Sequence, residues 1–118
     1  QAQRQRRQIS KEITFDGDFT LVQCSPHWNN LIEQLWSSLE KKQLQASGVT
    51  VKFKLKNFQI LQHSKSFKLA LSSQTEMILA TQQLIQEMLI PAHVQFRLIG
   101  VGVYQLSEKQ AQSQLSLW

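Results

Sequence analysis

Lysines recur at every second position of one apolar segment, and this is the clearest chemical pattern in the chain. Lys52, Lys54 and Lys56 alternate with apolar residues between Val49 and Leu55. Because successive side chains of a strand point to opposite faces, the apolar set would enter a core and the three ammonium groups would share the other face. Such a face suits phosphate groups, although a charge run on a strand is as often a merely solvated surface.

A second cationic segment opens the chain. Arg4, Arg6, Arg7 and Lys11 precede the first acid, and the whole sequence holds 13 Lys+Arg against 8 Asp+Glu, a net charge of +5. A basic excess of this kind attracts polyanions. No apolar stretch is long enough to cross a bilayer, so nucleic acid is favoured over a membrane. We expect residues 1–7 to be a linker from a longer polypeptide.

Catalytic and metal-binding patterns are absent from the sequence. The acids fall mostly at expected turns, caps and solvated helix faces, and no pair is placed to hold catalytic metal ions. His27, His63 and His93 lack metal-ligand spacing. Cys24 is the only cysteine, which excludes an internal disulfide and fits a reducing cytoplasm. We therefore expect no catalytic residue, metal site or cofactor in this chain, and a cytoplasmic location.

Periodicity predicts the elements that position these residues. A first strand runs from about Gln8 to Phe15 and ends at the turn-forming Asp16-Gly17-Asp18. Ser25 is the expected N-cap of a first helix, with Pro26 at its first position and Gly48 as its stop. The apolar stripe of this helix comprises Trp28, Leu31, Ile32, Leu35, Trp36 and Leu39.

After the lysine-bearing strand we expect a third strand over Lys65–Leu71, with Lys68 facing outward. Ser73-Gln74-Thr75-Glu76 has the form of a capping box that begins a second helix. Its buried stripe would be Met77, Ile78, Thr81, Leu84, Ile85 and Met88. The last strand, His93 to Leu106, changes phase, which predicts a bulge near Gly100.

The expected fold is α+β with the order βαββαβ. Each helix has one apolar stripe, so both must cover the same face of a four-stranded sheet. The other face stays open and carries the lysines of the strands. The domain would span residues 8–106, followed by a flexible tail over 107–118.

Three segments of this plan resemble a known family. Arg6–Phe15, Val51–Phe58 and Arg97–Val103 are similar, in the same order, to strands of the little finger domain of Y-family DNA polymerases. The resemblance implies that the open sheet face lies along duplex DNA and holds phosphates without reading bases. Arg4 and Lys68 join this set by charge alone. The expected DNA-binding residues are Arg4, Arg6, Arg7, Ser10, Lys11, Lys52, Lys54, Lys56, Lys68 and Arg97. Gln8 and Gly102 depart from the family pattern, where serine and arginine are common.

The chain ends in a second motif. Gln114-Leu115-Ser116-Leu117-Trp118 resembles the bacterial sliding-clamp-binding motif, in which a glutamine, a leucine and an aromatic residue enter a pocket. The preceding residues 107–113 hold no apolar residue except Ala111, so the pentapeptide cannot be one stripe of an amphipathic helix. Expected clamp anchors are Gln114, Leu115, Leu117 and Trp118, the last in place of the usual phenylalanine. An accidental apolar terminus is the alternative.

The resulting prediction is a DNA-binding little finger domain of a bacterial translesion polymerase of the polymerase IV type. Its partners would be duplex primer-template DNA, the beta subunit sliding clamp and the rest of the polymerase chain, whose missing catalytic domain would hold magnesium. The equivalent domain of the SOS error-prone polymerase subunit is one alternative. An RNA-recognition-like module is another, but it needs aromatic residues on the open face, whereas Phe53 and Phe67 have core-facing parity. A ferredoxin-like protein-interaction domain would explain neither the cationic segment that opens the chain nor the terminal motif.

Overall fold

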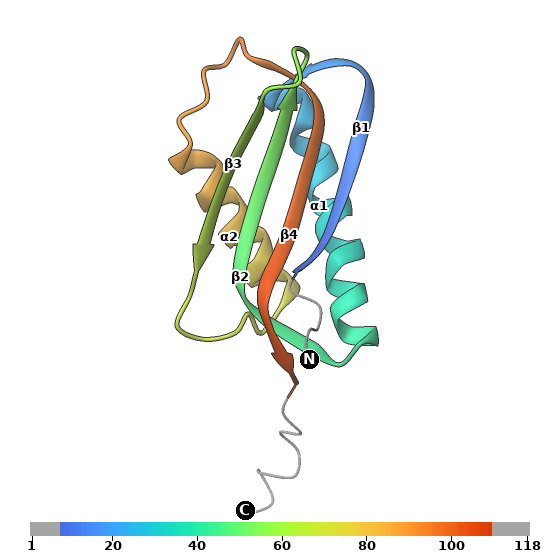
Figure 1. Ribbon diagram of the computed structural model, residues 1–118, viewed down its shortest axis with the longest axis vertical. Helices are drawn as coiled ribbons and strands as arrows, with labels where there is room; N and C mark the ends of the chain where they lie inside the picture. The colour runs from blue at the N-terminus through green and yellow to red at the C-terminus, as the bar shows by residue number, and fades with distance from the viewer. Residues whose placement is uncertain (1–7, 110–118) are drawn as a thin grey trace, which may run out of the picture.

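The computed structural model describes residues 8–109, which form one antiparallel sheet with two helices packed on the same face (Figure 1). The elements are β1 (Gln8–Thr20), α1 (Leu21–Lys41), β2 (Leu44–Leu55), β3 (Ile60–Ser66), α2 (Gln74–Glu87) and β4 (Gln95–Glu108). The strand order is β1-β4-β2-β3. The predicted α+β class, the βαββαβ order and the single covered face are confirmed.

The core lies between the helices and the two central strands. Apolar residues at odd positions of β2 and β4 are fully buried, as the alternation predicted; they are Val49, Val51, Phe53, Ile99, Val101 and Val103. The α1 stripe packs on them, with the Trp28 ring 5.5 Å from that of Phe53. Trp36, included in the predicted stripe, is only partly buried at its margin.

Helix α1 begins earlier than predicted. Thr20, not Ser25, is the N-cap: its hydroxyl accepts from Gln23 N, while Gln23 Oε1 accepts from Thr20 N at 2.8 Å. This reciprocal pair satisfies two orphan donors of the helix start, so the helix can begin at Leu21. Pro26 therefore lies inside the helix and removes one hydrogen bond of the ladder. Cys24 lies in the buried face of this first part of α1, where desolvation raises the pKa of its thiol to about 11.

The predicted turn at residues 16–18 is an irregularity within β1. Thr14 pairs with Leu98 and Phe19 with Phe96, so four residues of β1 lie opposite Arg97 alone. Arg97 is also the extra residue against β2, where the register shifts by one. The phase change of the last strand is thus real, but its bulge lies at Arg97 and not near Gly100.

Gly48 does not stop the first helix; it lies within β2. The helix ends at Lys41, and Gln43 turns the chain in the left-handed region with φ 57°. A Cβ on Gly48 would lie 2.5 Å from the ring of Tyr104 on β4. Glycine is required here because the tyrosine ring crosses the backbone, and not because a helix ends.

The predicted third strand is wrong by about five residues. β3 spans Ile60–Ser66, and residues 67–72 form a loop in which Leu69 is 81% exposed. β3 is an edge strand whose helix-side positions carry Leu61, His63 and Lys65, so the apolar alternation that marks a central strand is missing. The apolar spacing of the following loop imitated a strand instead.

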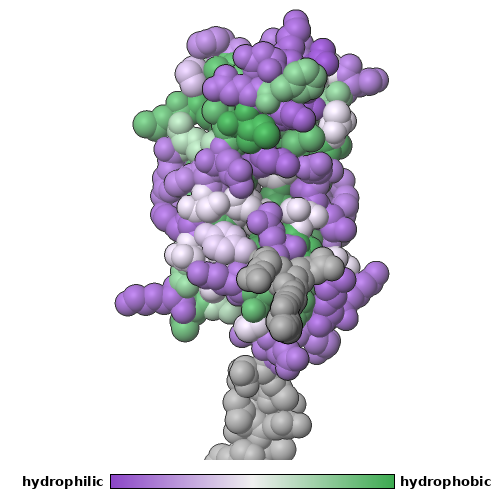
Figure 2. Space-filling view, viewed as in Figure 1, coloured by the Kyte–Doolittle hydropathy of each residue, from purple (hydrophilic) through white to green (hydrophobic). Residues whose placement is uncertain are grey.

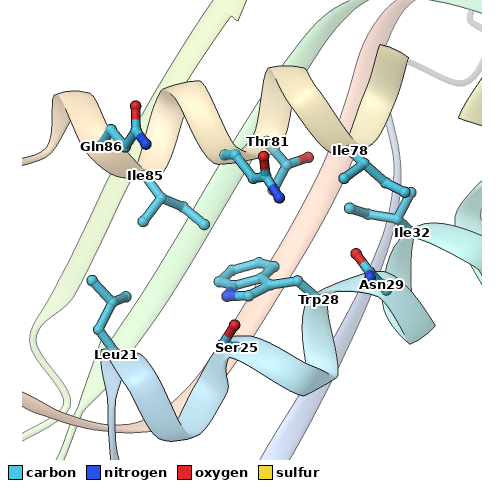
Figure 3. Close-up of a pocket in the computed structure, with 10 residues that line it drawn as sticks. Leu21, Ser25, Trp28, Asn29, Ile32, Ile78, Thr81, Ile85 and Gln86 are labelled. Atoms are coloured by element: carbon cyan, nitrogen blue, oxygen red, sulfur yellow. The ribbon is translucent and has the colours of Figure 1, made fainter. Parts of the chain in front are cut away.

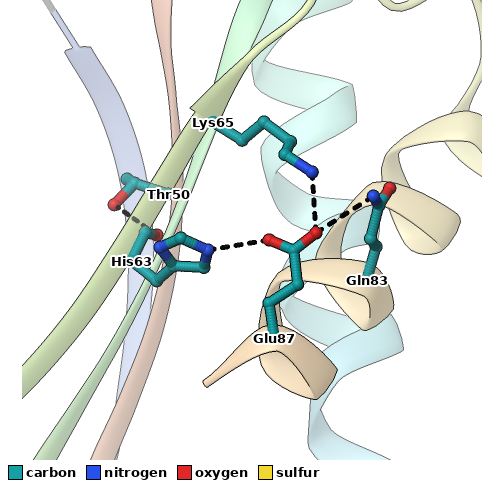
Figure 4. A network of polar contacts seen from close by, with 5 residues as sticks. All are labelled: Thr50, His63, Lys65, Gln83 and Glu87. Atoms are coloured by element: carbon teal, nitrogen blue, oxygen red, sulfur yellow. Dashed lines mark hydrogen bonds and ion pairs between the residues drawn. The ribbon is translucent and has the colours of Figure 1, made fainter. Parts of the chain in front are cut away.

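Helix α2 begins at Gln74, and Ser73 is its N-cap as predicted, with Ser73 Oγ accepting from Glu76 N at 3.1 Å. The reciprocal bond of the predicted capping box is replaced by one in which Glu76 Oε1 accepts from Ser72 N at 2.8 Å. Glu87, in its last turn, ties the helix to the edge strand (Figure 4). Lys65 Nζ donates to Glu87 Oε2 at 2.7 Å, and His63 Nε2 lies 2.8 Å from Glu87 Oε1. The hydrogen bonds from Lys65 and then His63 lower the pKa of the Glu87 carboxyl to about 2.

Candidate nucleic-acid interface

The uncovered side of the sheet, called the open face below, consists of the residues that alternate with the buried core positions. Strand pairing arranges them in four rows, each with one residue from β1, β4, β2 and β3. The rows are Gln8, Tyr104, Gly48 and Ser66; Ser10, Gly102, Thr50 and Ser64; Glu12, Gly100, Lys52 and Gln62; and Thr14, Leu98, Lys54 and Ile60.

The two middle rows form a shallow hollow of about 260 Å³ with a floor of small residues. Gly100 and Gly102 are buried and place no side chain on the β4 part of the floor, and a Cβ at Gly102 would lie 3.0 Å from Ser10 Cβ. On the β2 side the hollow is lined by Thr50, whose Oγ1 accepts from Ser64 Oγ of β3 at 2.7 Å. A floor of glycine and hydroxyl groups lets a phosphate backbone approach closely.

Of the predicted DNA-binding residues, Ser10, Lys11 and Lys52 line this hollow, and Thr50 and Gln62 line it without having been predicted. Gln62 belongs to β3, whose position was predicted incorrectly. Thr50 is buried and shares the outward parity of Lys52, but it carries no charge. Register against β4 was the missing information, since it alone puts Thr50 beside Gly102.

Most cations of this side are paired with acids. Lys52 Nζ lies 3.0 Å from Glu12 Oε1 within one row. Asp18, in the irregular part of β1, lies 3.0 Å from Arg97 Nε and 4.0 Å from Lys56 Nζ. The open face is therefore an arrangement of compensated charges around a small-residue hollow, less positive than the alternation of lysines suggested.

Lys54 differs from the other lysines of this face. Among the residues that the structure describes, it makes no ion pair, and its Nζ lies 5.3 Å from the centroid of the Phe58 ring. Phe58 belongs to the turn between β2 and β3. Figure 2 views the open face and shows hydrophobic surface gathered toward the end of the sheet where this turn lies in Figure 1, with more hydrophilic surface below it.

Lys11 and Lys68, both predicted to bind DNA, are not in the four rows. Lys11 pairs with Val101, a core residue, so strand alternation directs its side chain to the other side of edge strand β1, but Lys11 is still among the residues that line the hollow. Lys68 lies in the loop after β3, because that strand ends at Ser66. Arg4, Arg6 and Arg7 lie outside the described residues. So do the clamp-motif residues Gln114, Leu115, Leu117 and Trp118.

Tyr104 is the one aromatic residue in the four rows, and it lies in the end row against Gly48. An RNA-recognition module stacks bases on aromatic residues in the middle of its sheet. Here the middle rows carry glycine, hydroxyl and charged groups, which argues against that alternative.

A second hollow of about 250 Å³ lies on the other side of the molecule, between α1 and α2 (Figure 3). Its lining residues are Leu21, Ser25, Trp28, Asn29, Ile32, Ile78, Thr81, Gln82, Ile85 and Gln86. None carries a charge, so the hollow does not suit a polyanion. Within residues 8–109 no three His, Cys, Asp or Glu side chains gather as metal ligands, and neither described helix could cross a membrane.

Comparison with known proteins supports one family. The model of the impB/mucB/samB family C-terminal domain matches residues 6–117. DNA polymerase IV of Neisseria meningitidis serogroup C is 36% identical over 97% of this chain and 32% of its own length. The corresponding protein of Xanthomonas axonopodis pv. citri is 30% identical over 80% of this chain and 26% of its own. The chain thus spans about a third or less of these relatives.

Solved structures show the same fold. A chimeric Y-family DNA polymerase aligns with a TM-score of 0.75 at 18% identity, over 90% of this chain and 30% of the polymerase. A little finger domain of PolIV, solved in complex with the β-clamp processivity factor, aligns with a TM-score of 0.58 at 19% identity. That alignment covers 87% of this chain and 92% of the solved one.

Proposed function

This chain belongs to the impB/mucB/samB family, as the C-terminal little finger domain of a Y-family polymerase of the DNA polymerase IV type, and we propose that it holds duplex DNA for translesion synthesis. The observation that carries the proposal is the hollow of the open face. Its floor carries glycine and hydroxyl residues, and Lys11 and Lys52 are among the residues that line it. Contacts of this kind position DNA without reading its sequence.

The polymerase chemistry belongs to the remainder of the parent protein. The relatives are about three times as long as this chain, and a catalytic domain in the additional length would hold the magnesium ions of phosphoryl transfer. This domain would then bind the DNA, orient it and lengthen the residence time of the polymerase on the template. A parent of this kind acts in the cytoplasm, which the unpaired thiol of Cys24 fits.

A second part of the proposal concerns the sliding clamp. The terminal pentapeptide 114–118 carries the glutamine, leucine and aromatic anchors of a clamp-binding motif. A structural neighbour of this chain is a PolIV little finger domain solved with the clamp. We infer that the pentapeptide tethers the polymerase to the clamp.

Salt dependence of DNA binding tests the grip. The 118-residue chain should bind duplex primer-template weakly and without sequence preference, with log K falling by about 0.9 per phosphate contact against log salt. Replacing Lys52, Lys54 and Lys56 together by alanine should flatten that slope. Fluorescence anisotropy over a salt series measures it.

The matched control replaces Lys41, Lys42 and Lys68 by alanine. This variant loses the same three charges from exposed sites that are not on the open face, and it should keep the slope. If the slope of log K against log salt flattens equally in both triple variants, the effect is due to net charge alone and the assignment of DNA binding to the open face is wrong. Tighter binding of single-stranded RNA than of duplex DNA would favour the RNA-recognition alternative.

A further inference from the structure

Phe58 occupies an unusual place in the turn between β2 and β3. Phe58 N donates to Leu55 O at 2.9 Å, and Leu55 N donates to Gln59 O at 2.8 Å, which closes a three-residue loop. The third loop position of such a hairpin is left-handed, and Phe58 has φ 70°. Glycine takes this conformation without strain, whereas a bulky aromatic residue rarely adopts it.

The phenylalanine ring is not used to stabilise the described fold. Phe58 is 72% exposed and lies outside the hydrophobic core and the residues packed against it. Glycine would therefore suit position 58 better than phenylalanine, because it adopts the left-handed conformation without strain and exposes no apolar side chain. Strained backbone conformations cluster at functional sites, so we ask what the exposed ring contacts.

The surroundings of Phe58 indicate what that contact is. Ile60, 52% exposed, adjoins Lys54 in the end row of the open face. The Lys54 ammonium lies 5.3 Å from the Phe58 ring centroid, and the Lys56 side chain is 73% exposed beside the loop. An apolar, aromatic surface with ammonium groups at its rim matches a nucleobase attached to its phosphate.

We propose that Phe58 is a stacking platform for an unpaired template base, at the point where single-stranded DNA leaves the duplex held on the open face. Ile60 belongs to the end row of that face and also lines the hollow, and Phe58 lies in the turn next to it. Lys54 and Lys56 neutralise the phosphates that flank the stacked base. The proposal rests on the proposed function, because it takes the open face as the duplex site.

Binding to three DNA probes tests the proposal with the 118-residue chain. The probes are a blunt duplex, the same duplex with a 5′ single-stranded extension carrying 2-aminopurine at its first unpaired position, and the extension alone. Phe58→Gly removes the ring and also relieves the left-handed backbone, so this variant folds. Phe58→Tyr keeps a ring for stacking.

Phe58→Gly should weaken binding of the extended duplex by roughly 5- to 150-fold, the range that base stacking on an aromatic residue spans. Binding of the blunt duplex should be unaffected. In the parent chain, stacking of the 2-aminopurine base on the Phe58 ring should quench its fluorescence, and Phe58→Gly should abolish this quenching. Phe58→Tyr should bind like the parent. Leu89→Gly is the matched control, because Leu89 is also exposed and left-handed, with φ 53°, but follows α2 and is not on the sheet; it should bind all probes like the parent.

The outcomes separate this proposal from the proposed function. Normal binding of the extended duplex by Phe58→Gly overturns the stacking platform while leaving duplex binding in place. Equal losses on blunt and extended duplex also overturn it, because the ring would then be a duplex contact. If the parent chain forms a dimer and Phe58→Gly is a monomer, a second copy of the chain, and not a base, covers the ring. Absence of duplex binding, with Phe58-dependent binding of the single strand retained, would refute only the proposed function.

Discussion

Single acids set the charge of the open face. Glu12 and Asp18 between them hold Lys52, Arg97 and Lys56. These ion pairs are exposed or partly exposed, so each contributes little to stability and can open at low cost. A DNA phosphate can therefore replace the carboxylate, and the acids weaken binding because they compete with the phosphate for these cations.

Removal of one such acid should strengthen DNA binding. Glu12→Gln keeps the size of the side chain but frees Lys52, so we expect duplex affinity to rise by up to roughly fivefold, the equivalent of about 1 kcal/mol for an exposed pair. Glu33→Gln makes the same charge change at an exposed site of α1 and should have a smaller effect. Anisotropy titration compares the two. Weaker binding by Glu12→Gln would mean that the carboxylate holds Lys52 in its binding position.

At the residue scale, the sequence predicted the face on which Lys52 and Lys54 lie but not the partner of Lys52. Lys52 and Lys54 lie on the open face because strand alternation is a local property. The pairing of Lys52 with Glu12 joins β2 to β1 across β4, and no local pattern contains that register. Lys11 shares the parity of Ile9 and Ile13, so its place at the hollow also depends on its position in edge strand β1 and not on alternation alone.

Elements that bury a clear stripe were predictable, and the others were not. The apolar faces of α1, β2 and α2 appear directly in the sequence. Edge strand β3 does not show one, because its helix side is held by His63 and Lys65 contacting Glu87 and not by apolar packing alone. The start of α1 was misplaced because Ser25-Pro26 is a stronger local signal than Thr20, whose cap depends on the Gln23 side chain.

The contact between β3 and α2 should depend on pH. The pKa of Glu87 is lowered from 4.5 to about 2, so the native state binds fewer protons than the unfolded state between these values. The contribution of Glu87 to stability should be complete above about pH 4.5 and be lost as the pH falls toward 2. Urea unfolding from pH 2 to 7 should show wild type and Glu87→Gln converging in acid.

A second variant identifies the cause of that dependence. The Lys65 hydrogen bond is the largest cause of the lowered pKa, so Lys65→Met should remove most of the acid-sensitive contribution. Curves of unfolding free energy that run parallel for wild type and Glu87→Gln at every pH would contradict the role of Glu87 as the tie between strand and helix.

At the scale of the whole molecule, DNA grip and clamp binding are assigned to separate parts of the chain. The open face is built from the four strands, and the core cluster beneath it extends from Ile9 to Val103. The clamp motif begins at Gln114, outside the described residues. The residues that form the described core and line the hollow all lie within 8–109, so we expect the two proposed activities to be separable by truncation.

Deletion of residues 114–118 should abolish binding to the bacterial sliding clamp and leave both the unfolding free energy and duplex affinity unchanged. A short docking peptide owes its affinity to a few anchors, here Gln114, Leu115, Leu117 and Trp118. Leu117→Ala should therefore lose most of the affinity, whereas Ser116→Asp, between two anchors, should bind about as well as the parent. Titration of each variant against purified clamp measures the effect. Undiminished binding by the truncated chain would assign the clamp contact to the body of the domain, because no anchor of the motif would remain.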